Sequence, residues 1–225
     1  MANPLIHIFE NVTIGEGAVI HAPVVLGLPP AGAKDGELPL VIGRGAVLGP
    51  FTVIYAGTTI GDRFLTGHGA SVREDNLLGD DVAMGTHALL EPGNRIGNRV
   101  RMESHSALAM VTLGDDVYVG PNVVFADDPH PAGCPRYKDC LGGATVGNLA
   151  RIGAGSTILP GVVIGRNTLV GAGSVVVHDV EEGTVVAGNP ARIVKRIADL
   201  ECYPRFYERP YVWEPYAPGG KEGRP

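Results

Sequence analysis

Aromatic residues are scarce in this sequence, at 6% of 225 residues, and cysteine occurs only three times. So few cysteines, and an odd number of them, argue against a disulfide scaffold and indicate a reducing compartment. No apolar run approaches the roughly 18 residues of a membrane-spanning helix. The start, Met1-Ala2-Asn3-Pro4, lacks the charged and apolar segments of a secretory signal. We therefore expect a cytoplasmic protein without a membrane partner.

Positive charge is also in deficit, because 18 Lys and Arg face 24 Asp and Glu and leave a net charge of −6. An acidic chain is a poor partner for nucleic acid or for an anionic membrane surface. Hydrophobic residues make up 44% and charged residues 19%, a composition that excludes intrinsic disorder. The length suggests one or two domains at roughly 150 residues each.

Glycine, by contrast, is abundant: 33 of 225 residues are glycine, about twice the usual ~7%. Many of these glycines belong to a repeat. An apolar anchor recurs every six positions, with interruptions at 27–40 and 127–144 and one slip after Leu108. The anchors are Ile8, Ile14, Ile20, Leu26, Ile42, Leu48, Ile54, Ile60, Thr66 (the one polar member), Val72, Leu78, Met84, Leu90, Ile96, Met102, Leu108, Leu113, Val119, Phe125, Val146, Ile152, Ile158, Ile164, Val170 and Val176. Glycine often follows the anchor, and a small or β-branched residue often lies four positions after it.

A period of six matches neither the alternation of a half-buried strand nor the 3.6 of a helix. It predicts a solenoid in which each hexad is a short strand followed by a tight corner. An ordinary glycine-rich β-sandwich would alternate with a period of two and would not hold one frame over so many residues.

This pattern, [Leu/Ile/Val]-Gly-x-x-[small]-x over residues 8 to about 196, resembles the hexapeptide-repeat acyltransferases. It is closest in pattern to the nucleotide-amino-sugar N-acetyltransferases. The resemblance implies an all-β solenoid, a left-handed parallel β-helix with three hexads per coil, so that residues 18 apart stack. It also implies a homotrimer with its active site in the groove between adjacent helices.

The chain divides into three predicted parts. Residues 1–186 form the left-handed β-helix, with extruded loops near 27–40 and 127–144. Residues 187–202 are expected to form a short C-terminal capping helix, because Asn189 and Pro190 suit an N-cap and a first helical position. Residues 203–225 form a tail rich in aromatic residues and proline, which we expect to pack on the chain or on a neighbouring subunit.

Small residues near the C-terminus predict the donor site. Three pairs lie 18 apart, namely Gly153 and Gly171, Ala154 and Ala172, and Ser156 and Ser174. In the family that the sequence resembles, such a ladder receives the pantetheine arm of acetyl-CoA, the expected co-substrate. Gly153, Ala154, Ser156, Gly171 and Ala172 are therefore donor-site candidates, and Arg192 and Lys195 resemble the basic residues near the CoA phosphates. The alternative is that the small residues serve coil packing alone.

Three histidines predict the acceptor side. His87 and His105 lie 18 apart, each three residues after its anchor, and His68 lies one coil earlier, displaced by one position. A histidine near neutral pH is a natural general base for an attacking amine or hydroxyl. We take His105 as the first base candidate and His68 and His87 as substrate-binding candidates. The alternative is a polar seam between subunits.

The segment Gly120 to Asp128 resembles a stretch of the nucleotide-amino-sugar N-acetyltransferases, typically GPN-x-x-F-T-N-D. Asn122 is retained as a substrate-binding candidate, whereas Ala126 and Asp127 replace the usual Thr and Asn. The adjacent carboxylates of Asp127 and Asp128 are candidates for holding or deprotonating an ammonium group, unless they merely form a solvated turn. His130 is the second base candidate.

The resulting hypothesis is an acetyl-CoA-dependent N-acetyltransferase that acetylates the amine of an amino sugar by direct attack in a ternary complex. The amino sugar is expected to be nucleotide-linked. An O-acetyltransferase on a sugar or small alcohol is the near alternative. A γ-class carbonic anhydrase and a non-catalytic scaffold are remoter ones. No metal is expected, although His130, Cys134, Cys140 and Cys202 make up a possible structural zinc set whose spacing fits no standard motif.

Overall fold

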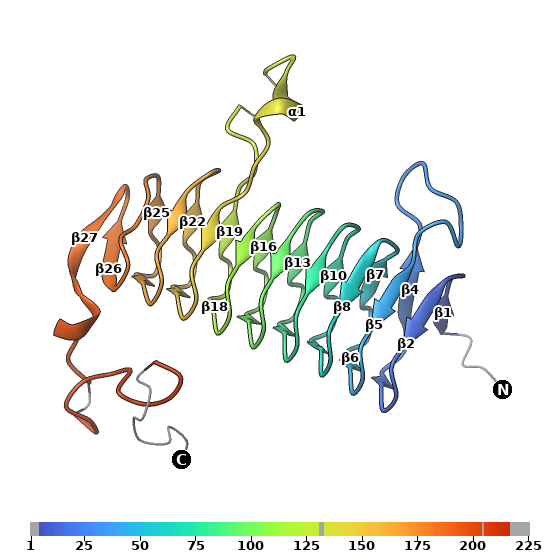
Figure 1. The fold of residues 1–225 in the computed structure, drawn as a ribbon, viewed down its shortest axis with the longest axis horizontal. Helices are drawn as coiled ribbons and strands as arrows, with labels where there is room; N and C mark the ends of the chain where they lie inside the picture. The colour runs from blue at the N-terminus through green and yellow to red at the C-terminus, as the bar shows by residue number, and fades with distance from the viewer. Residues whose placement is uncertain (1–4, 131–132, 204, 217–225) are drawn as a thin grey trace.

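The chain forms an elongated three-sided solenoid of parallel coils in a computed structural model (Figure 1). The structure describes residues 5–130, 133–203 and 205–216. Among these residues no helix has the length and apolar character needed to cross a membrane. The architecture agrees with the expected all-β parallel solenoid, and the left hand is the one that the sequence resemblance implies.

Each side of the solenoid is one sheet. Sheet I contains β1 (Ile6–Ile8), β4 (Val24–Leu28), β7 (Val53–Tyr55), β10 (Ser71–Val72), β13 (Leu89–Leu90), β16 (Ala107–Leu108), β19 (Val124–Phe125), β22 (Thr157–Ile158) and β25 (Val175–Val176). Sheet II contains β2 (Val12–Ile14), β5 (Leu40–Ile42), β8 (Thr58–Ile60), β11 (Leu77–Leu78), β14 (Arg95–Ile96), β17 (Thr112–Leu113), β20 (Thr145–Val146) and β23 (Val163–Ile164). Sheet III contains β3 (Val19–Ile20), β6 (Val47–Leu48), β9 (Leu65–Thr66), β12 (Ala83–Met84), β15 (Arg101–Met102), β18 (Tyr118–Val119), β21 (Arg151–Ile152), β24 (Leu169–Val170), β26 (Thr184–Gly188) and β27 (Ala191–Arg196).

The strands stack in the register that the repeat predicts. Ser71 pairs with Leu89, which confirms an offset of 18 residues per coil. The slip after Leu108 shortens one coil, because Arg95 pairs with Thr112. Thr112 then pairs with Thr145, so the segment between β19 and β20 is extruded without disturbing the stack.

Two loops leave the solenoid along the same edge, where the chain passes from sheet I to sheet II (Figure 1). One joins β4 to β5 and the other joins β19 to β20 and carries the short helix α1 (Tyr137–Cys140). We call this edge the loop edge. Any chemistry on the two loops is therefore carried on one side of the molecule.

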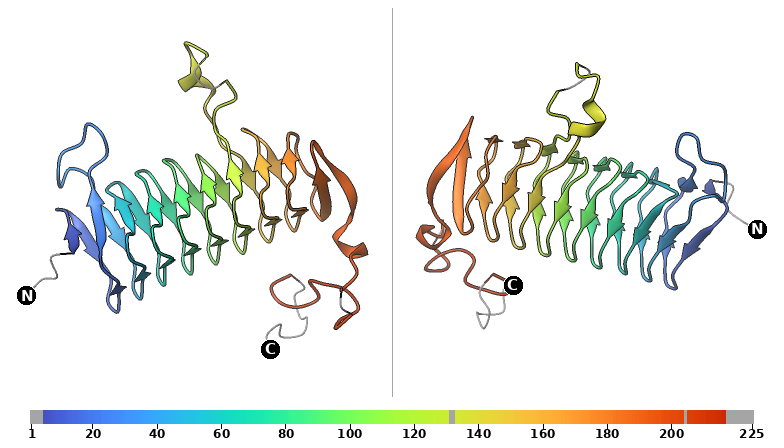
Figure 2. Two further views of the ribbon diagram at one scale, coloured as in Figure 1. Left: turned by 180° about the vertical axis from the view of Figure 1, so that it is seen from behind. Right: turned by 45° about the horizontal axis from the view of Figure 1, so that its top comes forward.

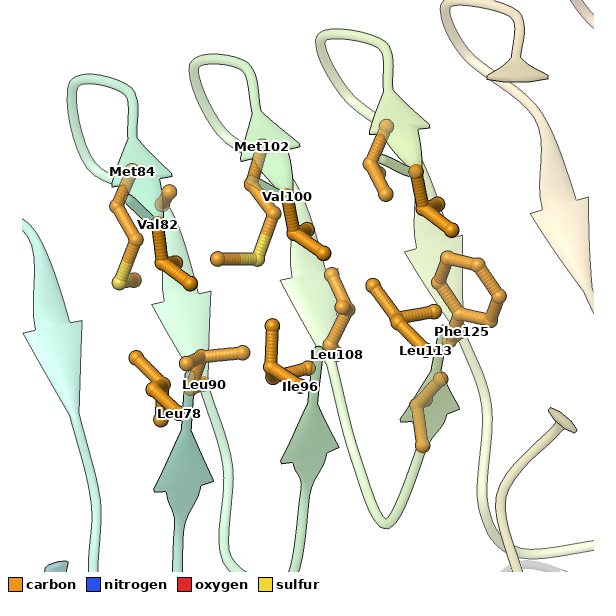
Figure 3. Packing of buried hydrophobic residues seen from close by; sticks show 14 of the residues in the cluster. Leu78, Val82, Met84, Leu90, Ile96, Val100, Met102, Leu108, Leu113 and Phe125 are labelled. Atoms are coloured by element: carbon orange, nitrogen blue, oxygen red, sulfur yellow. The ribbon is translucent and has the colours of Figure 1, made fainter. Parts of the chain in front are cut away.

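The interior is filled by the anchors. Every anchor from Leu26 to Val176 is buried, and its neighbours from adjacent coils pack against it, as Met84 and Met102 or Leu90 and Leu108 do (Figure 3). The small residues four positions after the anchors, such as Ala46, Ala70 and Ser106, are also buried. At the N-terminal end Ile8 remains 47% exposed, since no coil of the described chain covers it.

The glycine after the anchor is required by the closeness of the coils. A Cβ on Gly61 would lie 2.6 Å from the carbonyl oxygen of Gly79 in the next coil, which is closer than carbon and oxygen can approach. The third residue after the anchor adopts a left-handed conformation, as Arg63 does with a φ of 58°. The corner therefore requires a residue without a side chain directly after the anchor, and a left-handed backbone two residues later.

The edge between sheets II and III is held by polar side chains and is called the Arg–Asp edge. Arg63 donates to Asp81 at 2.6 Å, and Arg99 donates to Asp116 at 2.7 Å. The Arg63 guanidinium holds the pKa of Asp81 below its usual range. Along the same edge a carboxylate or amide oxygen accepts a backbone N–H from the coil before it, as Asp80 does from Asp62.

The expected capping helix over 187–202 is wrong. The segment is a β-hairpin, in which β27 runs antiparallel to β26, followed by the 3-10 turn η1 (Ile197–Asp199). Asn189 and Pro190, expected at a helix start, form the hairpin turn, a role that these residue types fill equally well. The β-branched Ile193 and Val194 favour a strand, and β26 offers an unpaired edge for it to complete.

Gly61→Ala tests the coil spacing. Overpacking against the Gly79 backbone should destabilise the fold by about 1–3 kcal/mol, seen as a lower midpoint in chemical denaturation. Gly142→Ala is the matched control, because a Cβ there meets nothing within 4 Å. Equal stability of the two variants would contradict the packing argument.

Candidate functional site

The three histidines form one row on the edge where the chain passes from sheet III to sheet I. Ring centroids of His68 and His87 lie 5.3 Å apart, and those of His87 and His105 lie 5.4 Å apart, both edge to face. All three side chains are exposed. The structure therefore confirms the predicted stacking, and we call this side the histidine edge.

Left-handed corners place these rings. His87 and His105 take φ values of 53° and 59°, and Asn122 continues the same corner position at 57°. One coil below His87 the equivalent residue is Gly69, and a Cβ there would run into the His87 ring. His68 lies one position before this glycine, and its Nδ1 lies 3.3 Å from the Thr86 hydroxyl. Its displacement from the row thus leaves room for the ring above.

The small-residue ladder lies on this same edge, directly beyond the histidines. Backbone hydrogen bonds run from Asn122 N–H to Ser104 C=O, from Gly155 N–H to Pro121 C=O, and from Gly173 N–H to Ala154 C=O. Ala154 and Ala172 are exposed, and nothing lies within 4 Å of a Cβ placed on Gly155 or Gly173. The edge is therefore a continuous track that passes from imidazoles to open backbone.

Ser156 does not belong to this track. It is fully buried, and its hydroxyl donates to the Gly171 carbonyl at 3.1 Å. Ser174, one coil later, donates to the same Gly171 carbonyl at 2.6 Å. The Ser156 hydroxyl joins two neighbouring coils from the inside, and its contact with a cofactor stays a prediction.

The basic residues lie at the end of the track. Ala187 is the neighbour beyond Gly171, and it pairs across the hairpin with Arg192. Lys195 follows on the same strand, and both side chains are exposed. Arg192 also lines a cavity of about 200 Å³ together with His178 and Asp179. Sequence reasoning missed His178, because it lies outside the repeat positions that drew attention to the other histidines.

Asp127, Asp128 and His130 lie elsewhere. They begin the long loop on the loop edge, so the width of sheet I separates them from His105 within one chain. Asp128 accepts the backbone N–H of His130 at 2.8 Å, and the Asp127 carbonyl accepts from Gly142 at 2.9 Å at the base of the loop. The carboxylate of Asp128 therefore helps to shape the turn, and His130 remains exposed.

The possible zinc set is not assembled in this chain. Cys134 and Cys140 lie on the long loop, whereas Cys202 follows the terminal hairpin, and all three are free thiols. Among the residues that the structure describes, no group of three or more His, Cys, Asp and Glu side chains is placed to hold a metal ion. The three histidines of the histidine edge are stacked ring to ring rather than converging on one point.

The histidine edge places two features close together: a surface for an extended ligand and a row of imidazoles. Exposed backbone and small side chains let an extended ligand lie along the coils, and imidazoles continue the line at one end. Neighbouring coils are spaced at ~4.8 Å, so His105 and Ala154 are two coils, or roughly 10 Å, apart. An extended thiol arm can span this distance, and the His105 imidazole at the end of the track can accept a proton.

Gly69→Ala tests the packing of the row. The new methyl group should displace the His87 ring and shift its imidazole resonances in a long-range proton–nitrogen NMR spectrum, with smaller changes at His105. Gly173→Ala carries the same backbone penalty, because its φ is 70° against 67° for Gly69, but its Cβ meets nothing. A shift of the His87 resonances in the control variant would contradict a local steric cause.

Comparisons with known proteins agree with this architecture. The family model described as bacterial transferase hexapeptide (six repeats) matches residues 143–178, the coils that hold the small-residue ladder. Galactoside O-acetyltransferase of Escherichia coli K12 is 36% identical over 107 residues, 46% of this chain and 52% of that protein. Nodulation protein L of Rhizobium meliloti strain 1021 is 48% identical over 90 residues, 38% of this chain and 49% of that protein.

The chain spans about half the length of the curated relatives it matches. Among solved structures, the UDP-N-acetylglucosamine acyltransferase of Francisella novicida superimposes with a TM-score of 0.63 at 16% identity, covering 84% of this chain and 69% of that one. That likeness concerns the fold. Residues 143–178 thus match the hexapeptide-repeat transferase family, and the same six-residue repeat forms the other stacked coils of the chain.

Proposed function

We propose that this protein is an acetyl-CoA-dependent acetyltransferase whose acceptor is the amine of an amino sugar carried on a nucleotide. The observation that carries the proposal is the single track of the histidine edge, where open backbone at Ala154 and Ala172 runs into the imidazole of His105. The acetyltransferase name of the Escherichia coli relative supports the reaction class. The segment Gly120 to Asp128 supports an amine acceptor.

The donor lies along the track in this proposal. Pantetheine follows Gly153, Ala154, Gly171 and Ala172, and the CoA phosphates reach the exposed Arg192 and Lys195. The thioester then lies toward Asn122. This order places the reactive carbonyl beside the histidines and leaves the charged end of the donor at the basic hairpin.

The chemistry is a direct transfer. A histidine removes a proton from the acceptor ammonium, and the free amine attacks the thioester carbonyl. Backbone N–H groups stabilise the oxyanion. The attacking nitrogen passes its second proton to the departing sulfur, so that CoA leaves as the free thiol. No covalent acetyl-enzyme is needed, because both substrates are bound together.

The position of the loop residues calls for more than one subunit. Asp127 and His130 lie on the loop edge, and within one chain sheet I keeps them from the track. A homotrimer brings the loop edge of one subunit to the histidine edge of the next. In that arrangement the carboxylate of Asp127 binds the acceptor ammonium. Either His130 of one subunit or His105 of the next then acts as the base.

O-acetylation is the second candidate function. It is favoured by the identity to a protein named galactoside O-acetyltransferase and by the departure of Ala126 and Asp127 from the typical amine-acceptor segment. A hydroxyl acceptor carries no positive charge, so the two carboxylates would then have no ammonium group to bind. Comparing amino sugars with their hydroxyl counterparts as acceptors separates the two functions.

Ala172→Leu tests the donor track. The larger side chain should leave the melting temperature unchanged, because Ala172 is exposed, and should weaken acetyl-CoA binding at least tenfold in calorimetric titration. Ala172→Ser keeps a small residue and should bind as the unmodified protein does. Unchanged affinity for acetyl-CoA in the leucine variant would contradict binding of the donor along this edge.

His105→Asn and His130→Asn separate the two base candidates. Asparagine tolerates the left-handed backbone of His105, so loss of a base is measured without added strain. The variant that removes the base should lose about 10²–10⁴-fold in kcat, assayed as thiol release from acetyl-CoA. His21→Asn, exposed on the same edge near the N-terminal end, serves as the control. Unchanged kcat in both variants would assign the proton to a carboxylate or to the substrate itself.

A further inference from the structure

The segment after the terminal hairpin folds back onto sheet III. Residues 205–216, here called the C-terminal strap, return toward the last coils beneath β27 (Figure 2). Its rings pack on one another, with the Tyr211 centroid 5.0 Å from that of Tyr216 and the Trp213 centroid 5.1 Å from that of Tyr207. The strap packs on Arg151 of the solenoid, whose guanidinium carbon lies 3.8 Å from the Tyr211 ring centroid and 4.8 Å from that of Tyr216.

Arg151 is an unusual residue for the outer face of a strand. It lies on β21 between Tyr118 and Leu169 of the adjoining coils, and it is only 4% exposed. Its Nη2 donates to the side chain of Asn167 at 2.6 Å. Its Nε and Nη1 are buried without a hydrogen-bond partner among the described residues. These two nitrogens carry most of the guanidinium's N–H donors.

Among the residues that the structure describes, no carboxylate compensates the charge of Arg151. Arg63 and Arg99 pair with carboxylates, whereas no ion pair is found between Arg151 and another described residue. Burial lowers the pKa of Arg151, and Tyr211 and Tyr216 oppose that shift only in part. A buried guanidinium with two unpaired nitrogens and no carboxylate partner among the described residues opposes folding, so the site lacks an acceptor at these two atoms.

A cavity of about 290 Å³ adjoins this guanidinium. Its other lining residues are Tyr118, Ile152, Gly153, Leu169, Tyr211 and Tyr216, among which there is no carboxylate. Burial raises the pKa of Tyr118 and of Tyr216, so both phenols keep their O–H donors at neutral pH. With a water occupying ≈30 Å³ of liquid, the space admits a small acid group and part of the molecule that bears it.

We propose that Arg151 binds an oxyanion, a phosphate or a carboxylate, in this cavity, and that the C-terminal strap closes over the bound group. The site does not depend on the proposed transferase activity. Because Gly153 is shared with the donor track, the oxyanion is either a phosphate of the CoA donor or an acid group on a different molecule. Both present the same chemistry to Arg151.

A purely mechanical role makes a different prediction. If Arg151 only anchors the strap by its contact with Tyr211, added anions have no effect, and an apolar side chain of similar length serves nearly as well. Trp213 distinguishes the two roles, because it is the sole tryptophan of the chain and lies within the strap. Its fluorescence reports the strap alone.

The experiment titrates inorganic phosphate into the full chain at constant ionic strength, following Trp213 fluorescence and melting temperature. We expect a saturable fluorescence change and a rise in melting temperature in the unmodified protein. Both should vanish in Arg151→Met. Arg151→Lys, which retains the charge but not the guanidinium, should bind at least tenfold more weakly and covers the event that the methionine variant does not fold.

Arg101→Met is the matched control. Arg101 occupies the same column of sheet III, since it pairs with Tyr118, but it is exposed and bonded to Glu103 at 2.6 Å. It should respond to phosphate as the unmodified protein does. No response in the unmodified protein, or an equal response in Arg151→Met, would overturn the proposal.

Parallel titrations with CoA, dephospho-CoA and UDP identify the source of the oxyanion. A response to CoA that weakens with dephospho-CoA assigns the 3′-phosphate of the donor. A response to UDP or phosphate without one to CoA assigns a separate molecule. If CoA binds without any change in Trp213 fluorescence, the donor-track proposal is supported and the CoA phosphates do not bind at Arg151. The two proposals can therefore be contradicted independently.

Discussion

Stacking of parallel coils through backbone hydrogen bonds is the constraint on which every other feature of this protein depends. Each strand is only two or three residues long in most coils, so a strand alone has little stability. Registered pairing with the coils above and below supplies the missing hydrogen bonds, and the buried anchors supply the apolar contact. Because the stack repeats, any residue type placed at one repeat position recurs as a row along the outside.

The three edges use this repetition for different purposes. The Arg–Asp edge fills its row with alternating charges that pair between coils, as Arg63 and Asp81 do. The loop edge carries both extruded segments, and the strands that follow them pair with the neighbouring coil in register. The histidine edge changes along its length from imidazoles to bare backbone. One backbone geometry therefore supports a stabilising edge, an adaptable edge and an edge suited to an extended ligand.

Several features could be predicted from the sequence because they depend on periodicity alone. The stacking of His87 and His105 follows from their spacing of 18 residues and is present in the structure. Ser156 follows the same spacing, yet it turns inward, because the fourth position after an anchor faces the interior. Asn189 and Pro190 suit a helix start and a hairpin turn equally well, and only the free edge of β26 decides for the hairpin.

The sequence by itself determined the solenoid, the number of residues per coil, the two loops and the rows of like residues. Each of these is a local or a periodic property, written in the anchors and in the glycines beside them. The tertiary structure alone decided which rows share an edge: His105 with Ala154, but Asp127 across sheet I from both. Only the tertiary structure shows that the strap contacts Arg151. Tyr211 lies after the last coil, so its position depends on the path of the chain beyond the repeat. No spacing rule encodes such a contact.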